Sequence, residues 1–169
     1  MTISMYSASV PVFKQMLGSM SAFLTKAENH TVEKNIDPNV FLQARLFPDM
    51  FALLRQVQIA ADFAKGVCAR LAGVDVPSFA DDELTFADLQ TRISKTLTFI
   101  DSLTPAQIDG SEERDIVTGA GTAREKTFKG QSYLFNYGLQ HFFFHTTTVY
   151  NILRHNGVDV GKKDFIGSY

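Results

Sequence analysis

The C-terminal part of the chain constrains the fold most, because apolar residues recur there at the spacing of an α-helix. These residues are Leu134, Phe142, Val149 and Leu153. Asn156 and Gly157 follow them, and both residue types readily adopt the left-handed conformation that ends a helix. A helix with one apolar face has to bury that face. The segment therefore predicts a final helix that packs into a protein core.

Two histidines on this predicted helix are candidates for a functional site. His141 and His145 lie four residues apart, so both imidazoles project from one face about one turn apart. Phe142, Phe144 and Val149 flank them, and we expect both rings to point into the core. The pair fits two explanations: neutral core histidines satisfied by nearby hydroxyls, or ligands of a metal ion that takes a further ligand from another helix. The spacing alone does not decide between them.

Length and composition predict one soluble domain, residues 1–169. A chain of 169 residues with 45% hydrophobic content can bury a sizeable core without disulfides. We find no apolar run long enough to cross a membrane and no signal-peptide pattern. The one cysteine, Cys68, cannot form an internal disulfide, so we expect a cytoplasmic protein. Because the net charge is −2 and the basic residues are scattered, we expect neither nucleic acid nor a membrane as a partner.

Helical spacing of apolar residues predicts three earlier long helices and one short helix. Pro11 suits the first turn of the first long helix, and Gly73 ends the second. Thr85 and Asp88 form a capping box at the start of the third. In chain order the predicted helices are residues 10–29, the short 37–46, 48–71 and 85–103. Together with the final helix, they predict an all-α domain.

Two short segments before the final helix break the helical pattern. The stretches RDIVTG and REKTFKG have the composition of strands, and Ala120 and Gly121 separate them. They predict a small β-hairpin laid across the helices.

An acidic loop, residues 81–83, precedes the third long helix. Adjacent carboxylates on a loop do not all converge on one cation without help. We therefore expect this loop to be solvated.

Five stretches of the sequence resemble a known protein family, and they span nearly the whole chain. They are YSASVPVF, RLFPDMFALLRQVQIAADFAKG, ARLAGVDVP, HFFFH and RHNGVDVGKKDFIG. Together they resemble the bacterial domain-of-unknown-function family numbered nineteen ninety-three, in the DinB/YfiT-like superfamily. The resemblance implies a four-helix bundle with long connections, to which the hairpin before the last helix and the C-terminal tail are additions.

The resemblance also implies a metal site. In the wider superfamily, one histidine on the second helix joins two on the fourth helix, spaced H-x-x-x-H, to hold a divalent metal with open positions. His141 and His145 match the pair on the fourth helix. The second helix of this sequence carries no histidine, and Gln56, Gln58 and Asp62 are its polar candidates. An amide oxygen is a weak ligand for zinc or nickel, so the expected state is a degenerate site with Gln58 or Asp62 as third ligand, or no metal at all.

Two functions follow from these alternatives. The first is a divalent-metal-dependent transferase or hydrolase, in which the metal activates a bound water or thiol and Tyr137 lies beside the site. The second is a non-enzymatic homodimeric bundle in which the histidines are core residues and the core can hold a small-molecule ligand. Phe143 and Tyr150 lie on the outer face of the last helix and are the predicted dimer interface, unless the hairpin or tail covers them. A monomeric mass in light scattering would contradict the dimer.

Overall fold

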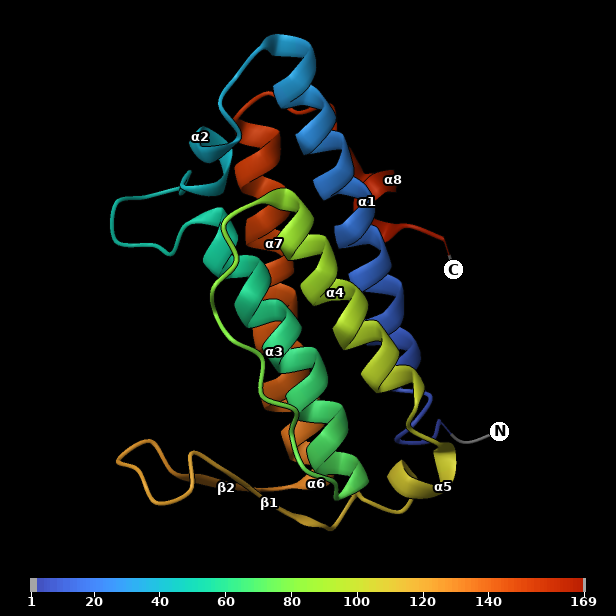
Figure 1. Cartoon of the computed structure of the whole chain (residues 1–169). Coiled ribbons are helices and arrows are strands. Elements are labelled where there is room, and N and C mark those ends of the chain that lie inside the picture. The colour runs from blue at the N-terminus through green and yellow to red at the C-terminus, as the bar shows by residue number, and fades with distance from the viewer. Residues whose placement is uncertain (1–2, 169) are drawn as a thin grey trace.

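Four long helices run side by side in the computed structural model, which describes residues 3–168 (Figure 1). They are α1 (Val10–Lys34), α3 (Leu53–Ala72), α4 (Phe86–Asp101) and α7 (Leu139–His155). Helices α1 and α3 each pack against both α4 and α7, so they lie at opposite corners of the bundle. The all-α four-helix bundle that the sequence predicts is confirmed. Within residues 3–168, no helix is long and apolar enough to span a membrane.

The remaining elements are short and connect or cover the ends of the long helices. They are α2 (Pro38–Leu42), α5 (Pro105–Ile108), β1 (Asp115–Thr118), β2 (Lys126–Lys129), α6 (Gly130–Ser132), the π-helix η1 (Tyr133–Gly138) and α8 (Lys162–Ile166). Strands β1 and β2 pair antiparallel, with Ile116 opposite Phe128. This hairpin lies at one end of the bundle just before the last helix, as predicted (Figure 1).

The start of α4 shows how local sequence sets a helix boundary. The carboxylate of Asp88 accepts a hydrogen bond from the backbone N–H of Thr85 at 2.9 Å. The hydroxyl of Thr85 in turn accepts one from the backbone N–H of Asp88 at 3.1 Å. These two bonds satisfy donors that the first helical turn leaves unpaired, and they form the capping box predicted from the sequence.

The connection between α2 and α3 is longer than the sequence predicts. The short helix ends at Leu42 instead of residue 46, and α3 begins at Leu53 instead of Pro48. Proline disfavours helical backbone at the residue before it, which keeps Phe47 out of a helix. The loop closes where the N–H of Leu53 donates to the carbonyl of Ala44 at 2.9 Å.

The last helix also begins later than its apolar pattern indicates, because residues 133–138 form the wide turn of η1. Gly138 is the last residue of this turn, and its backbone lies close to α3. A methyl group on Gly138 would lie 2.6 Å from a side-chain carbon of Val67. The packing of η1 on α3 therefore requires a glycine at this position.

We expect Gly138→Ala to lower the free energy of unfolding by about 1–3 kcal/mol, because Val67 has to move to admit the new methyl group. Gly18 provides a matched control, since it is exposed on α1 and a methyl group there would meet nothing within 4 Å. Gly18→Ala should raise the stability by up to about 1 kcal/mol. Urea denaturation of the two variants would measure both changes. Two changes of the same sign would contradict this account of Gly138.

The tail covers part of the surface that the sequence analysis assigns to a dimer interface. Phe143 and Tyr150 are both partly buried within the chain. The ring of Tyr150 lies 5.6 Å from that of Phe165 in α8 and 6.4 Å from that of Phe23 in α1. The alternative explanation, coverage by the tail, therefore holds for Tyr150. The homodimer itself stays a prediction.

Candidate functional site

His145 is the buried member of the histidine pair, with 8% of its surface exposed. Its Nδ1 lies 2.6 Å from Oε1 of Gln56 on α3. The amide N–H of Gln56 donates to the carbonyl of Phe51 at 3.0 Å, which turns the amide oxygen toward the imidazole. An amide oxygen only accepts, so Nδ1 of His145 carries the proton and donates it. The predicted core position of His145 is confirmed, and an amide satisfies it instead of a hydroxyl.

His141 is exposed, so the prediction that it points into the core is wrong. Phe63 on α3 stacks on its ring, with centroids 4.6 Å apart and planes 7° apart. The ring centre of Tyr137 lies 4.5 Å from that of His141, so Tyr137 is next to this histidine, as predicted. The ring of Phe63 also lies 6.0 Å from that of His145. A phenyl ring from α3 thus lies against both imidazoles.

Both histidines are poor bases in this setting. Burial, together with smaller effects of His141 and Arg55, lowers the pKa of His145 to about 4. Burial and the positive charge of Lys126 also lower the pKa of His141. Both imidazoles are therefore neutral at pH 7.

The predicted third ligands, Gln58 and Asp62, are engaged elsewhere. The amide N–H of Gln58 donates to Glu83 at 2.6 Å, and its amide oxygen accepts from Arg55 at 2.9 Å. Asp62 pairs at 2.8 Å with Lys65 and at 2.8 Å with Arg92 of α4. The structure does not bring either side chain into contact with the histidines; Gln56 meets His145 instead.

The donor set therefore does not fit the three-ligand metal site that the resemblance implies. It comprises two imidazoles and one amide whose oxygen already accepts a hydrogen bond. In residues 3–168, no three side chains of histidine, cysteine, aspartate or glutamate are grouped so that they could hold a metal ion. A catalytic zinc site needs three protein ligands of good affinity, and an amide is a weak one.

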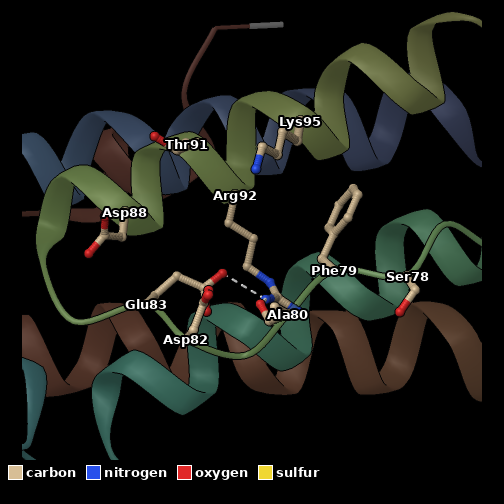
Figure 2. A pocket seen from close by; sticks show the side chains of 9 residues that line it. All are labelled: Ser78, Phe79, Ala80, Asp82, Glu83, Asp88, Thr91, Arg92 and Lys95. Carbon is tan, nitrogen blue, oxygen red and sulfur yellow. Dashed lines mark hydrogen bonds and ion pairs between the residues drawn. The ribbon is translucent and has the colours of Figure 1, made fainter.

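Arg92 is a central residue that the sequence analysis missed. Only 1% of its side chain is exposed, and it reaches from α4 to the loop before that helix (Figure 2). Its guanidinium pairs with Glu83 at 2.7 Å, with Asp62 at 2.8 Å and with Asp81 at 2.9 Å. The expectation of a solvated acidic loop is wrong for Glu83, whose side chain is only 8% exposed, whereas Asp81 and Asp82 are exposed as expected.

The ion pair with Arg92 stabilises the ionised form of Glu83 in this loop. Burial alone would raise the pKa of Glu83, but hydrogen bonds from Arg92 and Gln58 outweigh it and hold this pKa below its usual range. A hollow of about 370 Å³ lies beside the network. Its lining includes Arg92 and Lys95 from α4 and Asp82 and Glu83 from the loop before that helix (Figure 2). Its walls carry charges of both signs, so it selects no simple class of ligand.

A second hollow lies beside the histidines and has aromatic walls. It measures about 210 Å³, and α3, η1 and the end of β1 form it. Its lining residues are Asp62, Phe63, Arg70, Thr118, Tyr133 and Tyr137. We call it the aromatic hollow. The rings of Tyr133 and Tyr137 lie 5.9 Å apart and nearly parallel, and Phe128 of β2 contacts both.

Part of this hollow has a signal in the sequence. Tyr133, Tyr137 and His141 follow one another at intervals of four, which places them along one side of a helical segment. Phe63, which lines the hollow, and Phe128, which packs on Tyr133 and Tyr137, carry no such signal, because α3 and the hairpin bring them there through long-range packing.

Comparison with known proteins agrees with this architecture. The family described as "Domain of unknown function (DUF1993)" matches residues 5–166. A solved structure of a DinB family member protein from Shewanella denitrificans is similar at 38% identity and a TM-score of 0.90, covering 97% of this chain and 92% of that one. No curated protein matches the sequence. The chain therefore belongs to the DUF1993 family and is a DinB-like protein.

Proposed function

We propose that this protein is a small-molecule-binding bundle whose site is the aromatic hollow, and that it is not a metal-dependent transferase or hydrolase. The observation that carries the proposal is the pairing of the histidines: Gln56 fixes His145, and Phe63 stacks on His141. Both partners come from α3, the helix from which a third metal ligand would have to come.

The pairing of His145 disfavours metal binding on chemical grounds. A metal at Nδ1 would have to displace Gln56, leaving a buried amide oxygen without its donor, which costs about 1–3 kcal/mol. The other α3 side chain beside His145 is Phe63, whose ring centre lies 6.0 Å from that of the imidazole, and a phenyl ring supplies no lone pair for a metal. The site therefore lacks the ligands that make zinc or nickel binding strong.

The groups near the hollow suit binding better than catalysis. Burial raises the pKa of the Cys68 thiol, so this cysteine is no thiolate nucleophile. Burial also raises the pKa of the Tyr133 phenol, so its hydroxyl keeps its proton at neutral pH. Aromatic walls favour a flat ligand, because stacked rings attract through dispersion and their quadrupoles. At about 210 Å³ the hollow is smaller than sites for drug-sized ligands, which suits a ligand of about one ring.

Titration with benzamide, a neutral one-ring probe, tests the proposal. In the presence of a chelator, we expect backbone NMR shifts confined to the elements around the hollow. Tyr137→Ala should weaken binding because it removes one wall. Phe47→Ala is a matched control, since that ring is 63% exposed and does not line the hollow. Shifts spread over the whole bundle, or equal binding by the Tyr137 variant, would contradict the proposal.

A further inference from the structure

We infer that the ligand of the aromatic hollow is a small planar organic anion whose charged edge is held by Arg70, Lys126 and Tyr133. This inference rests on the proposed function and adds the chemical class of the ligand. It follows from the charges, the hydrogen bonds and the ring geometry around the hollow.

The charge balance of the hollow is positive. Within residues 3–168, neither Arg70 nor Lys126 forms an ion pair with a carboxylate. The one carboxylate in the lining is Asp62, and Lys65 and Arg92 already pair with it. Arg70 in the lining and Lys126, whose Nζ lies 5.4 Å from the ring centre of Tyr137, are thus available to a ligand, whereas the charge of Asp62 is already compensated. An anion complements this surface and a cation would be repelled.

Arg70 and Tyr133 form a fixed group of donors. The Tyr133 side chain is buried, with 1% of the residue exposed, and its oxygen accepts from Nη1 of Arg70 at 3.2 Å. The same nitrogen donates to the carbonyl of Gly66 at 3.0 Å, which holds the guanidinium in place. Among residues 3–168, the Tyr133 hydroxyl accepts the bond from Arg70 but donates none. Its hydrogen and the remaining N–H groups of Arg70 can therefore bind a carboxylate, and such charge-assisted bonds are the stronger kind.

Aromatic rings give the hollow an apolar side. Phe63 and Tyr137 line it with their rings 5.9 Å apart and tilted by 60°, and Tyr133 lies nearly parallel to Tyr137, so a ligand can pack against these rings. The Nζ of Lys126 lies 5.4 Å from the ring centre of Tyr137, so it approaches the hollow from the hairpin. A planar anion can stack on a ring and direct its carboxylate toward the cations at the same time.

The test compares benzoate with benzamide, which has nearly the same shape and no charge. At low salt we expect benzoate to bind about tenfold more tightly than benzamide, because one charge-assisted hydrogen bond is worth about that factor in affinity. Arg70→Gln and Lys126→Gln should each reduce this preference severalfold. Lys126 is exposed on the hairpin, so its variant keeps the test valid should Arg70→Gln fail to fold. Lys95→Gln, an exposed lysine in the other hollow, should leave the preference unchanged.

The outcomes separate the two proposals. Equal binding of benzoate and benzamide would contradict the inference that the ligand is an anion, but it would leave the proposed binding function intact. A preference for benzoate that survives Lys126→Gln and Arg70→Gln would also overturn it. Binding of neither probe would contradict the proposed function itself, and the inference with it.

Discussion

Replacing Arg92 with methionine is expected to lower the free energy of unfolding by about 3 kcal/mol, because it leaves a buried carboxylate without its cationic partner. Glu83 carries most of this cost, since only 8% of its side chain is exposed. Asp62 and Asp81 are 38% and 42% exposed, so water screens them and their share is smaller. In a domain of this size, the change corresponds to a melting temperature lower by about 6–12 °C.

Lys95→Met is the matched control for this substitution. Lys95 lies three residues further along α4 and lines the same hollow, but it is exposed and forms no ion pair among residues 3–168 (Figure 2). Its replacement should change the stability by no more than about 0.5 kcal/mol. Thermal denaturation of both variants measures the difference. An Arg92→Met protein as stable as the Lys95→Met protein would show that the ion-pair network does not hold the loop.

The second large effect concerns pH. The pKa of His145 is about 4 in the folded chain, against 6.5 for an unperturbed histidine. Between these two values the unfolded state binds more protons than the folded state, so acidification favours unfolding. The contribution of His145 to stability is complete above pH 6.5, is lost progressively as the pH falls, and is gone at about pH 4. Over this range the loss amounts to about 3 kcal/mol at most.

A comparison with His145→Gln isolates this effect. Glutamine does not titrate, and its amide can still hydrogen-bond to Gln56. Both proteins share all their carboxylates, so the difference between their stabilities, followed by urea denaturation from pH 7 to about pH 4.5, reports His145. We expect the wild-type protein to lose stability faster on acidification. Parallel curves would mean that burial does not lower the pKa of His145.

Those parts of the fold that depend on local sequence could be predicted. The apolar spacing of the long helices, the capping box of Thr85 and Asp88, and the hairpin before the last helix are local signals, and the structure contains each of them. The burial of His145 also followed from its position on the helical wheel, because α7 presents its apolar face to the core.

The partners of the site residues could not be predicted in the same way. Gln56 and Gln58 are two residues apart, so they point to different sides of α3, and only the rotation of that helix in the bundle decides which one meets His145. This rotation turns Gln58 toward the loop before α4 and Gln56 toward α7. The sequence analysis named Gln58 or Asp62 as the third ligand, but the structure brings Gln56 to His145.

Arg92 and His141 show two further limits of the sequence pattern. Arg92 lies next to Ile93, three residues after Leu89, and therefore within the apolar stripe of α4. An arginine there indicates a buried ion pair, but the pattern does not reveal that its partners come from the preceding loop. On the helical wheel, His141 lies close enough to the apolar face to be counted with it. The ring that packs on it, Phe63, belongs to a helix some eighty residues earlier in the chain, so this contact could not be predicted from the pattern.

The metal content of the purified, untagged protein tests the central claim most directly, namely that Gln56 and Phe63 keep the histidine pair free of metal. It would be measured by elemental analysis before and after dialysis against zinc or nickel. Gln56→His is the positive control, because it replaces the amide beside His145 with a third imidazole. We expect the wild-type protein to hold far less than one ion per chain and this variant to hold more. Near-stoichiometric metal in the wild-type protein, lost in His145→Ala, would contradict the account.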